Sequence, residues 1–176
     1  MKISRIYNGI VNAYLRKFNP VKWARKIGVK VGDNTELGDS TAFSSEPYLI
    51  TIGNHCQITR NVTFHTHGGG NVIRRYIPDF DCFGKIIIED WVYIGSDAII
   101  LPGVTIGEGS IIATASVVTK SIPPRVVAAG NPAKVICSID DYIQRNKKYN
   151  THSKGMGYAD KKKLLENISD DKLIKK

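Results

Sequence analysis

The feature that most constrains this chain is a repeat of six residues. Every sixth residue from Ile88 to Val118 is Ile or Val, and the same register occurs earlier in the chain. The first positions of these hexads are Val31, Leu37, Phe43, Ile52, Ile58, Phe64, Ile88, Ile94, Ile100, Ile106, Ile112 and Val118. An α-helix would spread every sixth residue over drifting faces, and a strand alone would show a period of two. The repeat therefore predicts a mainly β chain that turns a corner after each hexad.

Three such hexads make one coil of about 18 residues, and stacked coils enclose a prism-shaped core. The first position points a branched side chain inward, and the fifth position adds a small inward residue near the corner. On this register Cys56 and Ile122 occupy fifth positions, so both are expected in the core. Glycine recurs at the second position, where we expect it to relieve the backbone at the bend: Gly32, Gly38, Gly53, Gly95 and Gly107.

The repeat is interrupted twice, between Phe43 and Ile52 and again over residues 68–85. Most of the coil is scaffold, so we expect the chemistry where the repeat breaks. Just before the second break, the register turns Thr66 inward and His67 outward, and three glycines follow that let a backbone or a substrate approach closely. A long loop held on a rigid scaffold commonly shapes a binding site.

The two ends of the chain differ from the coil. Residues 2–18 have the spacing of an amphipathic helix, which we expect to cover one end of the prism, with a helix on a membrane surface as the alternative. Ser138-Ile-Asp-Asp141 resembles a capping box that opens a helix through about Asn146. The domains expected are residues 1–26 as helix and connection, 27–137 as the coil with its loop 68–85, and 138–176 as a helix and basic tail with a hint of a second helix.

The net charge of +9 is concentrated at the two ends. Residues 1–30 hold eight Lys and Arg and no acid, whereas residues 31–143 carry a net charge of −5. The body therefore offers no basic groove for nucleic acid, and the basic ends are either plain solvated termini or a means of peripheral contact with an anionic membrane. No apolar run reaches the length of a membrane span and the N-terminus lacks a signal-peptide pattern, so a cytoplasmic protein is expected.

The closing hexads carry recognisable motifs. Tyr93-Ile-Gly-Ser96, Ile100-Leu-Pro-Gly-Val-Thr-Ile-Gly107, Ser116-Val-Val-Thr-Lys120 and Ala128-Ala-Gly-Asn-Pro-Ala-Lys134 resemble the hexapeptide acetyltransferases. Upstream, Ser44-Ser-Glu-Pro-Tyr-Leu-Ile50 and Phe64-His-Thr-His-Gly-Gly69 resemble the branch that modifies capsular or lipopolysaccharide sugars. This resemblance implies a left-handed parallel β-helix, a homotrimer with sites between subunits, and transfer of an acetyl group from acetyl-CoA to a sugar hydroxyl in surface polysaccharide biosynthesis.

The resemblance also implies that His67 is the catalytic general base. A neutral imidazole would take the proton of the sugar hydroxyl as that oxygen attacks the thioester, without a covalent acyl-enzyme. Sugar-modifying relatives often carry an acid directly after this histidine, where this chain has Gly68. The group that orients the imidazole must therefore come from elsewhere, with Glu46 or a backbone carbonyl as candidates. Further candidates for orienting the base or binding the acceptor are Tyr48, His65 and Asn71, although His65 also reads as an ordinary surface residue.

For the cofactor, the resemblance implies a groove beside the C-terminal coils. The matching residues are Gly95, Ser96, Thr114, Thr119, Lys120 and Lys134, with Arg125 as a looser candidate for meeting the phosphates of CoA. Small side chains would leave strand amides open to the pantetheine arm, and cations would face the phosphates.

Three other readings remain open on the sequence. The chain could acetylate serine or another small molecule, although only about 30 residues precede the first hexad. It could resemble gamma-class carbonic anhydrases, in which three histidines bind zinc; here His65 and His67 would need His55 or His152 as a third ligand. It could also be an inactive structural trimer. We expect no metal, because the histidines are badly spaced for one site and Cys56, Cys82 and Cys137 form no CxxC pair.

Overall fold

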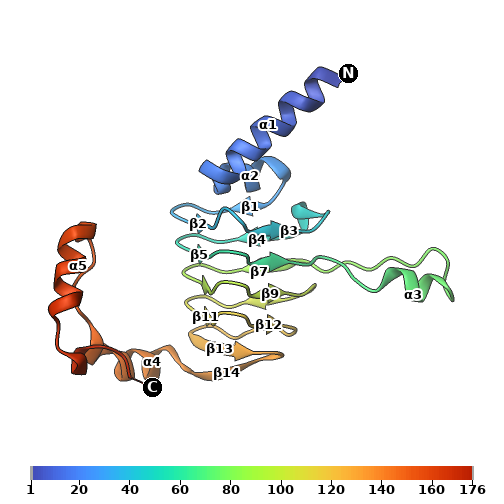
Figure 1. Ribbon diagram of the computed structural model, residues 1–176. Helices are drawn as coiled ribbons and strands as arrows, with labels where there is room; N and C mark the ends of the chain where they lie inside the picture. Colours follow the sequence, from blue (N-terminus) through green and yellow to red (C-terminus); the bar gives the residue numbers. More distant parts are fainter. Residues whose placement is uncertain (1, 176) are drawn as a thin grey trace. The chain divides into compact units, whose positions relative to one another are not determined.

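The computed structural model describes residues 2–175, with the side chains of residues 1–8 outside the description. The chain divides into two compact units, Met1–Ile139 and Asp140–Lys176. The first unit is a left-handed parallel β-helix preceded by two helices (Figure 1). The predicted fold class is confirmed.

The coil has three faces, each formed by one sheet of short parallel strands. Face A contains β1 (Lys30–Val31), β4 (Ile50–Ile52), β7 (Ile86–Ile88) and β10 (Thr105–Ile106). Face B contains β2 (Glu36–Leu37), β5 (Gln57–Ile58), β8 (Tyr93–Ile94), β11 (Ile111–Ile112), β13 (Val126–Gly130) and the antiparallel β14 (Ala133–Ser138). Face C contains β3 (Ala42–Phe43), β6 (Thr63–Phe64), β9 (Ile99–Ile100) and β12 (Val117–Val118). We name the three edges of the prism the A–B, B–C and C–A corners, after the faces that they join.

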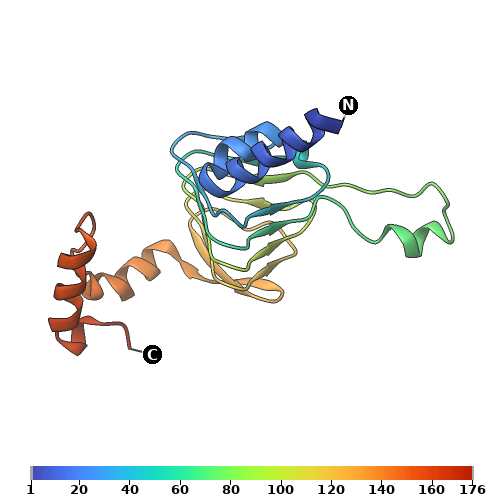
Figure 2. The ribbon, with the colours of Figure 1, turned by 45° about the horizontal axis from the view of Figure 1, so that its top comes forward.

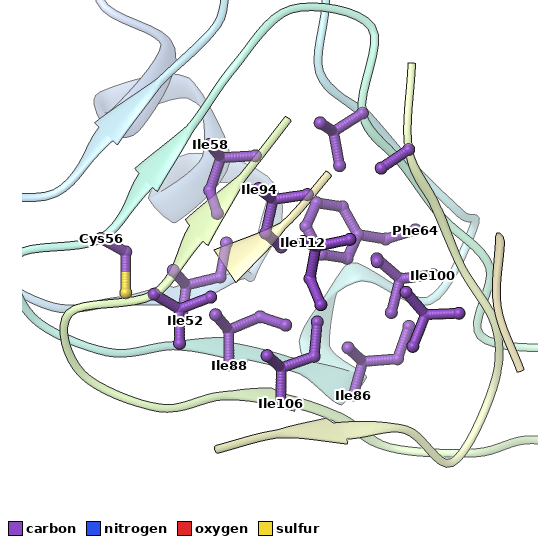
Figure 3. Packing of buried hydrophobic residues seen from close by; sticks show 14 of the residues in the cluster. Ile52, Cys56, Ile58, Phe64, Ile86, Ile88, Ile94, Ile100, Ile106 and Ile112 are labelled. Atoms are coloured by element: carbon purple, nitrogen blue, oxygen red, sulfur yellow. The ribbon is translucent and has the colours of Figure 1, made fainter. Parts of the chain in front are cut away.

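The core is a set of stacked columns of first-position side chains. Ile58 pairs with Ile94 and Ile94 with Ile112 on face B, and Phe64 pairs with Ile100 on face C. These side chains meet in the middle of the prism (Figure 3) and are at most 1% exposed. Burying one such side chain fully contributes roughly 1.5–3 kcal/mol, so the repeat is the main source of stability. The fifth-position Cys56 is buried too, as predicted.

The glycines of the second position have a different role from the expected one. None of them has a positive φ; instead, a Cβ on Gly95 would lie 2.5 Å from the backbone nitrogen of Thr114 on the next coil. They are needed where one coil approaches the next. The bend itself uses the left-handed conformation at the fourth position, at Asn34, His55, Asn61, Trp91, Asp97, Gly103, Gly109, Ala115 and Arg125.

The last coil also departs from the predicted register. Ile122 pairs with Ile106 and so occupies a first position of face A, not a fifth position of face C. The hexad that begins at Val118 is therefore shortened to four residues, and the regular spacing resumes with Ala128, which pairs with Ile112. Pro123 and Pro124 follow this shortened hexad, and a Cβ on Gly107 would meet the backbone nitrogen of Pro124 at 2.4 Å.

Two helices precede the first strand, where the sequence predicted one and a connection. Helix α1 spans Lys2–Phe18 and helix α2 spans Pro20–Ile27. The Oδ1 atom of Asn19 caps α2 by accepting a hydrogen bond from the Lys22 amide, and Gly28 ends it in the left-handed conformation. Ala24 of α2 is fully buried in the core cluster, so α2, rather than α1, covers the open end of the coil.

The second unit is made of short helices. Helix α4 (Ile139–Asn146) lies where the capping-box sequence predicted a helix, and α5 (Tyr158–Asn167) forms around Leu164 and Leu165. Two 3-10 turns, η2 (Lys147–Tyr149) and η3 (Asp170–Lys172), complete it. Over residues 2–175, none of the helices combines the length and the apolar character that crossing a membrane requires.

Candidate active site

Both interruptions of the repeat fall at the C–A corner, on neighbouring coils. The first contains the 3-10 turn η1 (Pro47–Leu49), between β3 and β4. The second contains the loop 68–85 with the short helix α3 (Gly70–Arg74), between β6 and β7. Because Phe43 pairs with Phe64 in a parallel register, the two corners stack directly on each other. The loop extends from this corner as an arm (Figures 1 and 2).

The stacking of these corners brings Glu46 to His67. The Oε2 atom of Glu46 lies 2.7 Å from Nδ1 of His67. The same oxygen accepts a 2.7 Å hydrogen bond from the hydroxyl of Thr66. The Glu46 side chain is 16% exposed and that of His67 is 43% exposed, so the carboxylate is largely covered while the imidazole remains accessible.

Thr66 is a residue whose function the sequence did not suggest. The register placed it inward, and it is fully buried, but an inward threonine reads as filler for the core. Its amide donates to the Ser44 hydroxyl at 3.1 Å, and that hydroxyl donates to the carbonyl of Phe64. The amide of Thr66 is thus held by the preceding coil, while its hydroxyl binds Glu46 of that same coil. The signal in the sequence was a polar residue turned inward directly before the candidate base.

These contacts fix the charge state of the carboxyl and the tautomer of the ring. The hydrogen bond from Thr66 lowers the pKa of Glu46 below its ordinary value of 4.5, the bond from His67 lowers it further, and partial burial opposes both. An ionised carboxylate only accepts hydrogen bonds, so Nδ1 of the neutral imidazole carries the proton. The lone pair is then on Nε2, the nitrogen that does not face Glu46.

A pocket of about 530 Å³ opens beside the imidazole. Its lining comes from both interruptions: Ser45, Glu46, His67, Gly68, Gly69, Gly70, Asn71, Val72, Arg74, Asp81 and Phe83. The base of the loop is closed by a hydrogen bond from the Gly84 amide to the Thr66 carbonyl, and Phe83 meets the His67 ring edge-on. Gly69, directly before α3, has a φ of +75°. A residue with a side chain adopts this left-handed conformation only at a cost in free energy.

The loop is braced by its own polar contacts. Arg74 donates to the carbonyl of Phe80 at 2.9 Å and lies 3.5 Å from the carboxylate of Asp81. Its guanidinium approaches Gly70 so closely that a Cβ there would lie 3.0 Å from the side chain. The pocket thus presents the guanidinium of Arg74, the carboxylates of Glu46 and Asp81, and backbone groups of the glycine run, which suits a polar ligand.

The other predicted residues of this site separate into two groups. Asn71 lines the pocket, as a residue that binds the acceptor would. Tyr48 and His65 are exposed but are not part of the lining. A zinc site would need His55 near His65 and His67. Instead His55 lies at the A–B corner, stacked on Trp91 with 4.2 Å between ring centroids, while His65 and His67 lie at the C–A corner. No group of three or more His, Cys, Asp or Glu suited to a metal occurs in the part of the chain that the structure describes.

The predicted cofactor residues lie at two different corners of the chain. Gly95, Ser96 and Thr114 form the B–C corner, and Lys134 pairs with Ala129 beside them. Thr119 and Lys120 follow β12 and belong to the C–A corner, on the side of the coil that carries His67. Thr114, Thr119, Lys120 and Lys134 are all exposed. Face C separates the two groups within one chain.

A left-handed β-helix of hexads is the fold that the resemblance to hexapeptide acetyltransferases implied, and the histidine held by a carboxylate lies in a pocket at one of its corners. A sequence profile for the hexapeptide repeat of succinyl-transferase matches residues 85–120. Protein CapG of Staphylococcus aureus is 45% identical over 146 residues, which cover 81% of this chain and 85% of CapG. The chain belongs to the hexapeptide-repeat acetyltransferase family, and it is an acyltransferase.

Solved structures agree with this assignment. The polySia-specific acetyltransferase NeuO superposes with a TM-score of 0.56 at 33% identity, covering 62% of this chain and 51% of NeuO. A galactoside acetyltransferase in complex with coenzyme A superposes with a TM-score of 0.52 at 28% identity, covering 78% of this chain and 82% of that enzyme. The chain thus spans about half the length of NeuO and most of the galactoside enzyme.

Proposed function

We propose that this protein transfers the acetyl group of acetyl-CoA directly to a hydroxyl of a sugar, with His67 as the general base. The observation that carries the proposal is the contact between Nδ1 of His67 and Oε2 of Glu46 at the edge of an open pocket. This contact leaves Nε2 free to accept a proton, which is the property a general base needs.

The reaction needs no other group from the protein to balance. The sugar hydroxyl gives its proton to Nε2 of His67 as its oxygen attacks the thioester carbonyl. The tetrahedral intermediate then collapses, the carbon–sulfur bond breaks, and the imidazolium returns the proton to the departing CoA thiolate. Glu46 stabilises the imidazolium between these steps, because the carboxylate faces the nitrogen that stays protonated throughout. No serine or cysteine is assigned as a nucleophile.

A sugar is the acceptor that the site and the relatives favour together. The pocket is lined by glycine backbone, Asn71, Arg74 and Asp81, which can exchange hydrogen bonds with several hydroxyl groups at once. The names of NeuO, which is specific for polySia, and of the galactoside acetyltransferase both refer to sugars. We place the reaction in the cytoplasm, in the synthesis of a surface polysaccharide. Serine is the second candidate acceptor.

We further propose a homotrimer whose sites lie between subunits. The cofactor residues of the B–C corner and the base at the C–A corner are separated by face C within one chain. A neighbouring copy that offers its B–C corner to this C–A corner would bring the two groups together. The arm 68–85 also carries exposed apolar side chains at Val72, Tyr76 and Ile77, which a neighbour would cover.

The chemical proposal is tested by following thiol release from acetyl-CoA in the presence of a panel of acceptors. The panel contains galactosides, N-acetylated and sialylated sugars, oligosaccharides and serine. We expect release that depends on a sugar and a product esterified at a hydroxyl. Faster release with serine, or release with no sugar in the panel, would overturn the proposed acceptor.

The trimer is tested by mixing two inactive variants. His67→Ala removes the base at one corner, and Thr114→Trp blocks the cofactor groove at the other. If each site draws on two chains, hetero-oligomers of the two variants regain activity that neither variant has alone. If each chain holds a whole site, mixing restores nothing. Sedimentation equilibrium of the wild type should give the mass of three chains.

A further inference from the structure

Helix α1 carries an apolar stripe that the first unit does not cover. Ile10, Tyr14 and Phe18 are spaced four residues apart and so lie along one side of the helix. Their exposed fractions are 65%, 61% and 70%. The rings of Tyr14 and Phe18 lie 4.9 Å apart, which makes the stripe continuous at its C-terminal end.

The stripe is not the side by which α1 attaches to the body. Val11 and Leu15 are half-buried, and α1 makes its main contacts with α2. Two further contacts fix the end of α1: Lys17 forms an ion pair with Asp39, and the guanidinium of Arg16 lies 5.2 Å from the ring centre of Trp23. The helix is therefore apolar on two neighbouring sides, of which only one is used. Figures 1 and 2 show α1 projecting past the end of the coil, which α2 already covers.

The charge around the stripe is mostly positive, with Asp39 paired to Lys17 as an acid beside it. Residues 1–30 contain eight Lys and Arg and no Asp or Glu, whereas the body beyond them is net negative. Lys22 and Lys26 of α2 are exposed, and the last turn of α1 is basic as well. A surface that combines aromatic and aliphatic side chains with an excess of cations matches an anionic bilayer, in which the headgroups meet the charges and the acyl boundary buries the stripe.

We propose that α1 docks this protein on anionic membranes by inserting Ile10, Tyr14 and Phe18 at the lipid interface. A second copy of the chain is the competing occupant, and the charge argues against it. Pairing these stripes would bring like-charged N-terminal segments together with no acid in either to compensate. Tyrosine is enriched at the boundary between headgroups and acyl chains, and phenylalanine is common on the apolar face of helices that lie there. This inference goes beyond the proposed function and does not depend on it.

The test is co-sedimentation of the full chain with vesicles. Phosphatidylcholine vesicles with and without phosphatidylglycerol are compared at low and high salt. We expect binding only to the anionic vesicles, weaker at high salt because the charges are screened. The variant Ile10→Ser/Tyr14→Ser/Phe18→Ser should partition at least about tenfold less, since three apolar side chains no longer leave water. Lys22→Glu/Lys26→Glu should also weaken binding.

A matched control separates the N-terminal helix from the basic C-terminal unit. Tyr158→Ser/Leu165→Ser removes two exposed apolar side chains of α5 and should bind vesicles as the wild type does. Equal vesicle binding by the α1 variant and the wild type would overturn the proposal. A wild-type protein that does not bind anionic vesicles would overturn it as well. A fall in oligomer mass in the α1 variant, without vesicle binding by the wild type, would assign the stripe to contact between copies. Thermal unfolding confirms that each variant is folded, so the result stands whatever the acceptor proves to be.

Discussion

Glu46 and His67 share a hydrogen bond of 2.7 Å although 21 residues separate them along the chain. The separation equals one coil of three hexads plus the three residues of η1, so both residues are the fourth in their hexads at the same corner. The insertion of three residues thus lengthens the sequence between the two residues without changing the corner at which they lie. In this chain a carboxylate from the preceding coil, not one directly after His67, contacts the imidazole.

Replacing His67 by Ala should remove most of the activity and leave the fold intact. General-base help contributes about 10²–10⁴-fold, so kcat should fall by at least about a hundredfold. The imidazole is 43% exposed and outside the core, so the thermal midpoint should hardly move. His65→Ala is the matched control, because His65 is on the same strand end but does not line the pocket. Steady-state kinetics showing the larger loss for His65→Ala would contradict the assignment.

Glu46→Gln should lower kcat by about tenfold or more while the KM for acetyl-CoA changes little. The amide can turn its NH₂ toward Nδ1, which favours the wrong tautomer and withdraws the charge that stabilises the imidazolium. Glu46→Asp should recover part of the rate if the side chain still reaches the ring. A Gln variant as active as the wild type would show that another group orients His67.

Thr66→Val should lower kcat, because it removes the hydroxyl that holds Glu46 while keeping nearly the same shape. It should also cost about 1 kcal/mol of folding stability. Thr41→Val is the matched control: Thr41 is 1% exposed and its Oγ1 has no hydrogen-bond partner among the described residues. That change should be neutral or stabilising. Denaturant unfolding and kinetics of both variants separate the two cases, and Thr66→Ser should restore the rate.

The contribution of Glu46 to stability should depend on pH in a defined direction. Its pKa is lowered in the folded protein, so the unfolded chain binds the proton more readily. The stabilisation is therefore fully present above the ordinary value of 4.5 and is lost as the pH falls through the lowered folded pKa. The difference in unfolding free energy between the wild type and Glu46→Gln should be constant near pH 7 and shrink below about pH 4.5. A difference that grows on acidification would contradict this sign.

Neutralising Lys120 or Lys134 should raise the KM for acetyl-CoA by roughly five- to thirtyfold and leave the acceptor KM nearly unchanged. Both lysines are exposed on a body of net negative charge, where the phosphates of CoA need cations. Because the two lie at different corners, both effects are expected only if two chains share each site. An effect of one lysine alone would restrict the groove to its corner. Added salt should weaken the wild type more than the variants.

Much of the fold could be predicted from the sequence because the repeat acts locally. The inward position can be recognised within each hexad by itself. Apolar side chains that recur every sixth residue are buried together when the chain turns a corner after each hexad. The same logic predicted that Cys56 is buried and that Thr66 points inward. It misplaced Ile122, since the hexad that begins at Val118 is two residues short and no periodicity reveals a change of period in advance. It also assigned the second-position glycines to the bend. They are in fact required because the backbone of the next coil lies too close to leave room for a Cβ, and that coil is far away in the sequence.

The candidate site was only half visible in the sequence. The glycine run and the broken repeat indicated His67, and the resemblance implied its role, but the sequence left both Glu46 and a backbone carbonyl as candidates for its partner. Only the stacking of one coil on the next decides between them, because a 2.7 Å contact across 21 residues depends on how the insertions are absorbed. The same holds for α1, whose amphipathic pattern the sequence displays in full. Which side packs and which remains exposed depends on α2, because α2 covers the end of the coil and α1 packs on α2.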